Sequence, residues 1–260
     1  MLDLHQIVSY FPEPLRAFKR NLLREYLQYK ILEVIYDSKF GDKLIFMGGT
    51  AIHIVHGNPR FSEDLDFDNR GLDLLAFESL GEVIRSKMEL QGFTLETKTV
   101  EAGAFRLSLR FPGLLRHLGL SRDPQEKLHL RVDAEPQCFP YEPTAFLIDK
   151  FDVFGRISVA PVDLLLAQKI LCMFLRPRPM GRDFFDALFL WGKTEPRPAY
   201  LKEKLCIEGA RNLRTKLIER CRELDFDSLA DDVAPFLYRP EDAKRVRLFL
   251  EFIENHEFKL

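Results

Sequence analysis

Cysteine is scarce in this chain, and long apolar runs are absent. The four cysteines are scattered and form no Cys-x-x-Cys pair, which argues against structural zinc and favours a reduced, cytoplasmic protein. The longest apolar stretch, residues 164–175, is interrupted by Gln168 and Lys169 and is too short to cross a bilayer. The N-terminus has no charged-then-apolar signal pattern. We therefore expect a cytoplasmic protein that does not engage a membrane.

The chain also lacks an excess of positive charge. Its 38 Lys and Arg residues and 40 Asp and Glu residues give a formal net charge of -2, so any contact with nucleic acid must be local. Hydrophobic residues make up 46% of the 260 residues, which is enough for a substantial core. This length fits one large domain or two small ones.

The first indication of function is a Gly-Gly pair at the end of a short apolar run. Residues 44–47 predict a strand that stops at Gly48 and Gly49, where glycine permits a sharp turn and a close approach of backbone to ligand. We expect Thr50 to cap a helix over residues 50–56. Because N–H groups at a helix start attract anions, Gly48, Gly49 and Thr50 are candidate phosphate-binding residues.

Two carboxylates, Asp64 and Asp66, follow soon after this pair. Residues i and i+2 of a strand point to the same face, so these carboxylates lie side by side and repel unless a cation neutralises them. One or two divalent ions held by such a pair is an arrangement that nucleotidyl transfer needs. Asp-x-Asp and Gly-Gly-Thr are each common as plain turns or solvated strands, but their conjunction favours catalysis.

A third carboxylate, Asp133, belongs to a segment in which apolar and polar residues alternate. The alternation over residues 127–135 predicts a strand with one core face and one polar face. The polar face comprises His129, Arg131 and Asp133. Asp133 either completes a carboxylate triad with Asp64 and Asp66 or is an exposed strand aspartate.

Apolar spacing predicts the remaining elements of the first half. They are helices over residues 14–38 and 73–91, paired strands over 93–100 and 104–111, and further strand over 144–159 with a turn at Gly155. On the second paired strand one face is polar, and we expect it to meet solvent rather than a triphosphate: Arg106, Ser108 and Arg110. The loop residue Arg60 either touches phosphate or is solvated.

The second half opens with a helix after Pro161, and Lys169 lies within its apolar setting. Such a lysine either extends to solvent or binds a ligand phosphate. A basic loop over residues 176–182, which ends in Arg182, leads into a helix that starts at Asp183. Capping of that helix by Asp183 is compatible with a functional role.

These motifs resemble the AbiEii/AbiGii-type toxin family of nucleotidyltransferases, within the DNA polymerase β-like superfamily. The resemblance covers roughly residues 15–195 and rests on three segments: Gly48-Gly49-Thr50, Asp64-Leu65-Asp66-Phe67, and Lys169 with Arg182-Asp183-Phe184-Phe185-Asp186. Asp186-Ala187-Leu188 departs slightly from the family's Asp-Leu order. The resemblance implies an α/β (α+β) fold with a mixed-sheet nucleotidyltransferase core over residues 1–160 and a helical C-terminal domain over 161–260, facing each other across a nucleotide-binding cleft.

The resemblance also implies a reaction. A nucleoside monophosphate passes from a nucleoside triphosphate to an acceptor hydroxyl, with Mg²⁺ or Mn²⁺ bound by three ligands: Asp64, Asp66 and Asp133. Asp133 would also help to activate the attacking hydroxyl. Lys169 and Arg182 would bind the triphosphate, and Asp183 or Asp186 would orient basic residues or the nucleotide.

The family's acceptor and partner are expectations of the same kind. The resemblance implies a toxin that acts on tRNA or another RNA, with a separately encoded antitoxin. Two alternatives remain open from the sequence: a nucleotide-binding interaction module without transfer, and a nucleotidyltransferase for small molecules such as antibiotics. Basic clusters at residues 211–222 and 244–247 are either solvated helix faces or an RNA groove, and the interleaved acids favour the former.

Overall fold

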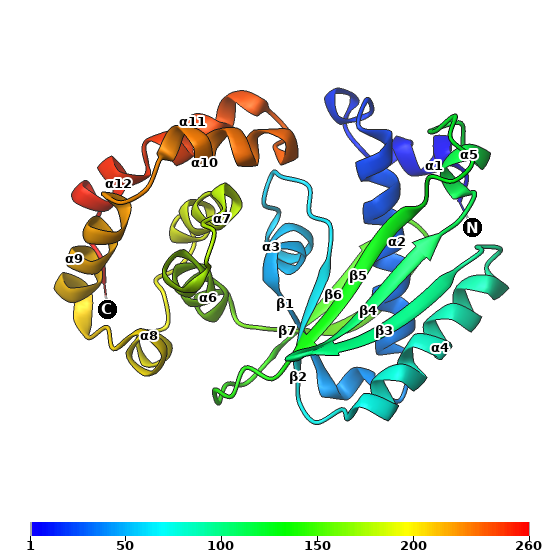
Figure 1. Cartoon of the computed structure of the whole chain (residues 1–260), viewed down its shortest axis with the longest axis horizontal. Coiled ribbons are helices and arrows are strands. Elements are labelled where there is room, and N and C mark those ends of the chain that lie inside the picture. The colour runs from blue at the N-terminus through cyan, green and yellow to red at the C-terminus, as the bar shows by residue number, and fades with distance from the viewer. Residues whose placement is uncertain (1, 260) are drawn as a thin grey trace. The chain divides into compact units, whose positions relative to one another are not determined.

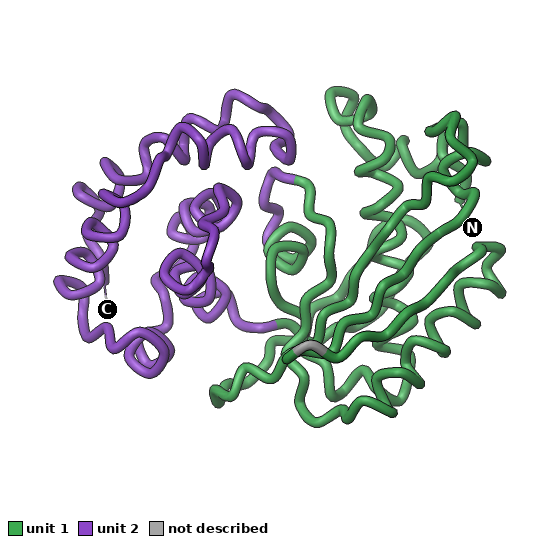
Figure 2. The backbone as a smooth tube through the Cα atoms, viewed as in Figure 1, with its two compact units in different colours: residues 1–55, 61–159 green, residues 56–60, 160–260 purple. Residues whose placement is uncertain are grey.

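The computed structural model describes residues 2–259, which form two compact units (Figure 2). The first, called here the sheet unit, comprises residues 1–55 and 61–159. The second, the helical unit, comprises residues 56–60 and 160–260. The loop 56–60 therefore groups with the helical unit, whereas the sequence-based division placed it in the core.

The sheet unit is organised around a seven-stranded mixed sheet with the order β3-β4-β5-β2-β1-β7-β6 (Figure 1). Its strands are β1 (Leu44–Met47), β2 (Leu65–Asn69), β3 (Glu96–Ala102), β4 (Ala104–Phe111), β5 (Leu128–Glu135), β6 (Thr144–Lys150) and β7 (Val153–Val159). β2 is parallel to β5 and β1 is parallel to β7, whereas the other neighbours are antiparallel. The predicted mixed α/β fold is confirmed.

The sheet unit also contains helices. They are α1 (Leu4–Ser9), α2 (Lys19–Tyr36), α3 (Gly48–His56), α4 (Leu74–Leu90) and the short α5 (Leu114–His117). α2 contacts β7 and α4, and α4 contacts β3 and β4. Gly81 lets α4 approach the sheet closely, because a Cβ there would lie 3.1 Å from Leu107 Cδ1. Asp73 caps α4 by accepting a hydrogen bond from the Ala76 amide.

The turn between β6 and β7 corrects one prediction. It falls on residues 151–152, and Gly155 lies inside β7. Phe151 adopts a φ of 60°, a conformation that usually selects glycine. Its ring packs among four other aromatic rings, which stabilises the turn: Tyr10, Phe11, Tyr26 and Tyr29. Tertiary packing thus places this turn where local sequence signals do not.

The helical unit consists of seven α-helices with short 3₁₀ turns among its described residues. They are α6 (Val162–Leu175), α7 (Gly181–Trp191), α8 (Pro198–Leu205), α9 (Gly209–Cys221), α10 (Phe226–Val233), α11 (Lys244–Arg247) and α12 (Phe249–Asn255). α7 contacts both α6 and α10. At the start of α7, Gly181 donates its N–H to Asp232 Oδ2 at 3.0 Å. A Cβ at Gly181 would lie 1.8 Å from the Leu229 carbonyl oxygen, so only glycine fits. Along residues 2–259, every helix falls short of the length and apolarity that a bilayer crossing needs.

Candidate active site

Strand register brings two of the predicted carboxylates together. Asp66 on β2 is the register partner of Asp133 on β5, and Met47 at the end of β1 is the register partner of Asp66. Side chains of register partners share a face, and adjacent strands lie roughly 4.8 Å apart. Asp66 and Asp133 are therefore neighbours on one face of the sheet, and both are partly exposed.

Asp64 lies just before β2, on the same stretch of chain as Asp66. Its carboxylate accepts a hydrogen bond from the Arg131 guanidinium, and Arg131 shares the polar face of β5 with Asp133. Asp64, Asp66 and Asp133 are called here the carboxylate site. Their catalytic and metal-binding roles stay predictions at this point.

The glycine pair is built differently from the prediction. α3 begins at Gly48 rather than Thr50, and Gly48 has a φ of 76°. A Cβ on Gly48 would lie 2.2 Å from Asp66 Oδ2, so this position needs glycine both for its conformation and for its space. The bare backbone at the start of α3 thus lies directly beside a carboxylate of the site.

Thr50 is not the cap of this helix, which corrects the prediction. It is the third residue of α3, and its hydroxyl donates to the Asp64 carbonyl oxygen and lies 2.9 Å from Ser62 Oγ. The hydroxyl finds these partners in a neighbouring loop, so it is not available to its own helix end. Thr50 consequently fixes the segment that carries Asp64.

Gln28 on α2 holds the same segment and was missed from the sequence. Its side-chain amide is fully buried and donates to the carbonyl oxygens of Ser62 at 3.0 Å and Glu63 at 3.1 Å. The available signal was an amide side chain in the apolar centre of a predicted helix, since buried amides need partners. Gln28 and Thr50 together anchor residues 62–64 before β2.

Arg106 is exposed, as predicted, and it also contacts the carboxylate site. It is the register partner of Asp133 across β4 and β5, and its Nε lies 3.1 Å from Asp133 Oδ1. Arg131 pairs with Asp64 in the same way, and this hydrogen bond raises the pKa of the arginine. Alternation assigned both arginines to the polar face correctly. Their pairing depends on register, which alternation does not reveal.

The residues present fit a hard divalent cation in their chemistry. Within residues 2–259, no three acidic, His or Cys side chains already converge as a closed ligand set. Asp64 and Asp133 are instead each paired with an arginine. Carboxylate oxygens are nevertheless the ligands that Mg²⁺ prefers, and one or two usually suffice beside substrate phosphates. Asp66 and Asp133 supply such a pair, and the Gly48 backbone lies beside Asp66.

The other predicted site residues lie in the helical unit, inside a buried ion network. Lys169 Nζ is 2.9 Å from Asp183 Oδ1 and 2.8 Å from Asp186 Oδ2. Arg60 binds Asp186 with both arms of its guanidinium, at 2.5 and 2.6 Å. Asn58 donates to Asp186 Oδ1 at 2.6 Å. These five residues, with Arg176 beside Asp183, are called here the buried ion network.

Asp186 and Lys169 keep their charges in this network. Burial alone would raise the pKa of Asp186, but Arg60 and Lys169 lower it to about 2. Burial alone would lower the pKa of Lys169, but Asp183 and Asp186 raise it. Two expectations are corrected. Arg60 is buried rather than solvated or aimed at phosphate, and Asp183 is the third residue of α7 rather than its cap.

The triphosphate-binding roles of Lys169, Arg182 and Asp183 stay predictions. In this structure the Lys169 ammonium is committed to two carboxylates, and Asp183 has a further ion pair with Arg176. Arg182 is partly buried at the second position of α7. The motif placed Lys169, Asp183 and Asp186 in one signature, and the structure brings these three side chains together.

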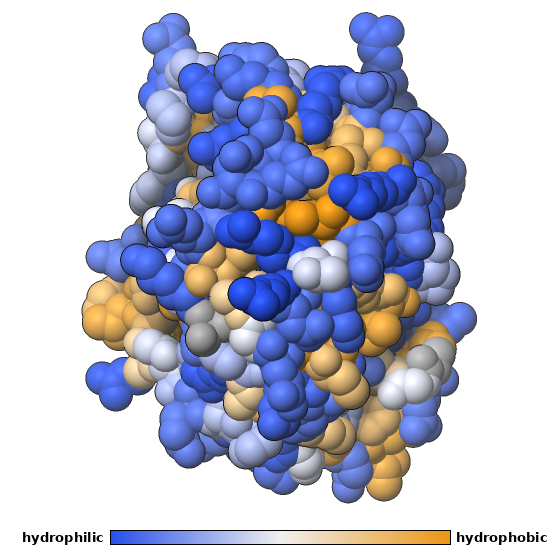
Figure 3. All heavy atoms as spheres, turned by 90° about the vertical axis from the view of Figure 1, so that its left-hand side faces the viewer, coloured by the Kyte–Doolittle hydropathy of each residue, from blue (hydrophilic) through white to orange (hydrophobic). Residues whose placement is uncertain are grey.

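Several residues of the C-terminal basic clusters contact other groups of the helical unit. Arg214 donates to the His256 carbonyl oxygen, and Lys216 Nζ lies 2.9 Å from the Leu205 carbonyl oxygen. Arg220 pairs with Glu223, and Arg247 pairs with two aspartates of α10. These contacts favour the interpretation as ordinary helix faces, which Figure 3 shows as mostly hydrophilic with apolar patches between.

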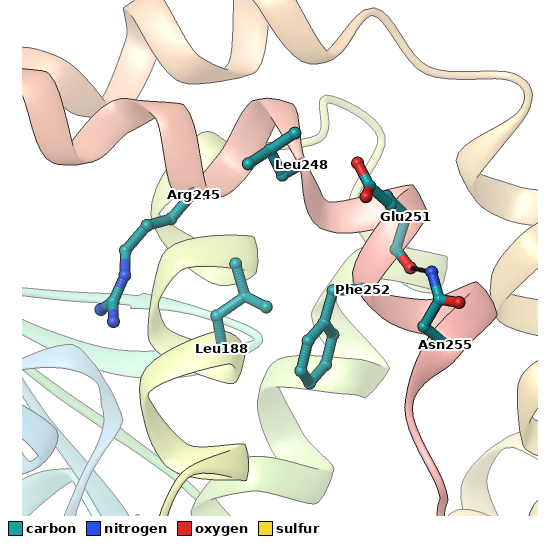
Figure 4. A pocket seen from close by; sticks show the side chains of 6 residues that line it. All are labelled: Leu188, Arg245, Leu248, Glu251, Phe252 and Asn255. Carbon is teal, nitrogen blue, oxygen red and sulfur yellow. Dashed lines mark hydrogen bonds between the residues drawn. The ribbon is translucent and has the colours of Figure 1, made fainter.

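A cavity of about 400 Å³ lies among α7, α11 and α12 of the helical unit (Figure 4). It is lined by Leu188, Arg245, Leu248, Glu251, Phe252 and Asn255. The Asn255 side chain donates to the Glu251 carbonyl oxygen at 2.8 Å. None of the predicted site residues is among the lining side chains.

Several solved structures share this fold. MenT4, a nucleotidyltransferase toxin from Mycobacterium tuberculosis H37Rv, aligns with a TM-score of 0.57 and 17% identity, over 99% of this chain and 91% of that chain. JHP933 from Helicobacter pylori aligns with a TM-score of 0.54 and 20% identity, over 90% of this chain and 91% of that chain. At these identities the likeness concerns the fold. None of the curated proteins compared with the chain matches it.

The family follows from the sequence itself. The family described as nucleotidyl transferase AbiEii toxin, type IV toxin–antitoxin system, matches residues 30–257. The chain belongs to this family and is a nucleotidyltransferase. The resemblance drawn from the motifs is confirmed, and the match extends further toward the C-terminus than the motifs do.

Proposed function

We propose that this enzyme transfers a nucleoside monophosphate from a nucleoside triphosphate to a hydroxyl of an RNA acceptor, with tRNA as one candidate. The reaction would depend on Mg²⁺ or Mn²⁺. The observation that carries the proposal is the register pairing of Asp66 with Asp133, directly beside Gly48. Adjacent carboxylates next to a backbone anion site are what nucleotidyl transfer requires.

Each residue of the carboxylate site has a role in this proposal. Asp66 and Asp133 would hold the metal ion, joined by Asp64. The ion, when bound, supplies neutralising charge for the phosphates and the leaving pyrophosphate. Asp133 would also help to activate the acceptor hydroxyl. Backbone N–H groups of the first turn of α3, from Gly48 to Thr50, would bind the triphosphate.

Basic side chains on the polar sheet face favour RNA as the acceptor. Strand register places Lys98, Arg106, Arg110, His129 and Arg131 on the same face as the carboxylate site, together with the acids Glu96 and Glu135. The face is therefore mixed in charge, and its arginines and lysine are groups that can bind the phosphates of a polyanion. We prefer RNA to the small-molecule alternative because of these basic side chains.

The toxin–antitoxin family implies a cognate antitoxin. We propose that toxicity follows from modification of the RNA acceptor, and that the antitoxin opposes this effect. The carboxylates needed for transfer are all present in the chain, so we disfavour a purely nucleotide-binding module.

The test incubates purified protein with Mg²⁺, each α-labelled nucleoside triphosphate in turn, and total RNA, followed by denaturing electrophoresis. We expect one nucleotide to label an RNA band, and Asp64→Ala to abolish the label. Chelation of the metal should give the same loss. Retained nucleotide binding with no labelled RNA in any reaction would contradict RNA transfer and favour another acceptor or the binding module.

A further inference from the structure

Two arginines contact the oxygens that the proposed function assigns to the metal. Arg131 binds Asp64 Oδ2, and Arg106 Nε lies 3.1 Å from Asp133 Oδ1. Both pairs lie on the open polar face of the sheet. The Arg131 side chain is 37% exposed and the Arg106 side chain is 45% exposed, so neither guanidinium is enclosed by its surroundings.

A metal ion and these guanidinium groups compete for the same negative charge. Three carboxylates face two arginines here, and a divalent ion beside both arginines would give an excess of positive charge. Cations drawn to the same carboxylates repel each other, more strongly where water is partly excluded. Partly exposed ion pairs are weak, so the arginines can be displaced at small free-energy cost.

A displaced guanidinium remains attached to its strand. Arg131 lies two residues from Asp133, and Arg106 lies opposite Asp133, so both side chains stay beside the carboxylate site after release. Guanidinium groups present planar, paired N–H donors that match phosphate oxygens. The backbone N–H donors of α3 begin next to Asp66 in the same region.

We propose that Arg131 and Arg106 are exchangeable counter-ions. In the metal-free enzyme they neutralise Asp64 and Asp133. When the metal replaces them, they turn to the nucleotide and bind its phosphates. This inference rests on the proposed function, and it assigns to two strand arginines a substrate-binding role that couples metal binding to nucleotide binding.

The exchange predicts that removal of Arg131 changes the metal affinity and the nucleotide affinity in opposite directions. Without Arg131 the metal meets no competitor at Asp64, so the metal should bind more tightly. The nucleotide should bind more weakly, because one phosphate ligand is missing. A residue that merely holds Asp64 in place would weaken both affinities together, so the pair of measurements separates the two roles.

Arg110 offers a matched control on the same sheet face. It lies on β4 as Arg106 does, and its register partners are His129 on β5 and Glu96 on β3. Among the residues that the structure describes, Arg110 forms no ion pair with a carboxylate, so its removal changes the charge of the face without freeing a metal ligand.

The experiment titrates the full chain with Mn²⁺ and follows free Mn²⁺ by electron paramagnetic resonance, without nucleotide. A second titration, at saturating Mn²⁺, measures binding of a non-hydrolysable nucleoside triphosphate analogue.

For Arg131→Gln we expect Mn²⁺ affinity to rise about threefold, as removal of a partly exposed ion pair implies. We expect analogue affinity to fall about tenfold, as loss of a charge-assisted hydrogen bond implies. Arg106→Gln should change both affinities in the same directions. Arg110→Gln should change Mn²⁺ affinity by less than about twofold at moderate salt.

Arg131→Lys keeps the charge and should recover much of the analogue affinity. Thermal unfolding of every variant serves as the control for an intact fold. Equal or weaker Mn²⁺ binding by Arg131→Gln overturns the exchange. So does unchanged analogue binding. Failure of the proposed function gives a different result. In that case Asp66→Asn would bind Mn²⁺ as tightly as the wild-type chain does.

Discussion

The sheet unit and the helical unit both gather aspartates with basic side chains, but they differ in access to water. At the carboxylate site, the Asp64 and Asp133 side chains are 23% and 21% exposed, and their arginine partners are more exposed still. In the buried ion network, Asp186 is 0% exposed and Asp183 is 1% exposed. The same residue types therefore serve in two different environments.

Burial decides whether an ion pair is fixed or exchangeable. A buried charge that loses its partner suffers an uncompensated desolvation penalty, so its partners stay in place. A partly exposed pair can be broken because water replaces the lost partner. The buried ion network is therefore a brace that holds residues 58–60 to α6 and α7. The ion pairs of the carboxylate site are partly exposed, so other cations can compete for their carboxylates.

The sharpest test of this contrast at the carboxylate site is Asp66→Asn. Loss of a metal ligand should remove about 4 kcal/mol of transition-state stabilisation, which lowers nucleotide transfer on the order of 10³-fold. The free energy of unfolding should change by less than about 1 kcal/mol, because relief of repulsion with Asp133 offsets small losses. Labelled-nucleotide transfer and urea unfolding measure the two quantities. A large loss of stability would place Asp66 with the structural residues instead.

The matching change in the helical unit, Asp186→Asn, should act mainly on stability. It leaves Arg60 and Lys169 without their shared carboxylate, and we expect the free energy of unfolding to fall by about 3–5 kcal/mol. The chain has one tryptophan, Trp191 on α7, so its fluorescence during urea unfolding reports on this unit. Glu208→Gln is the control, since it removes an exposed ion pair with Lys202 in the same unit. A similar small loss in both variants would contradict a bracing role.

Sequence patterns predicted the parts of the site that depend on local rules. Alternation assigned Asp133 to the polar face of its strand. The glycine pair marked the turn at the end of β1, where Gly48 lies beside Asp66, and its approach to a ligand stays a prediction. The motif resemblance selected the family, which the match over residues 30–257 confirms. These features are short-range, so a single sequence contains them.

Features that depend on partners distant in sequence were not predictable in the same way. The pairing of Arg106 with Asp133 depends on the register of β4 against β5. The Thr50 hydroxyl contacts Ser62 in a neighbouring loop instead of capping its own helix. Arg60 and Asp186 are 126 residues apart, and nothing local distinguishes a buried arginine from a solvated one. Lys169 is an example, because a lysine among apolar residues can form a buried ion pair as well as bind a phosphate.

Gly48→Ala tests the close approach at the carboxylate site and should have a smaller effect than loss of Asp66. The new Cβ would lie 2.2 Å from Asp66 Oδ2, so the carboxylate must move. Misplacement of a catalytic group by about 1 Å typically lowers the rate up to about 10²-fold. Gly57→Ala is the matched control. Gly57 has nearly the same φ, 75° against 76°, but a Cβ there meets nothing within 4 Å. Equal loss of transfer activity in both variants would attribute the effect to backbone strain alone.

The smallest of these effects concerns pH and isolates the charge of Asp186. Its folded pKa of about 2 lies below its ordinary value of 3.8, so the ionised form favours the folded state. This contribution, about 2 kcal/mol for a shift of this size, is present above pH 4 and is lost as the pH falls toward 2. Asp186→Asn has no such group to titrate. The difference in unfolding free energy between wild type and Asp186→Asn, followed by Trp191 fluorescence, should therefore shrink as the pH falls from 5 to 2. A difference that stays constant over this range would mean that the carboxylate contributes through shape rather than charge, and the contrast between the two regions would then rest on packing.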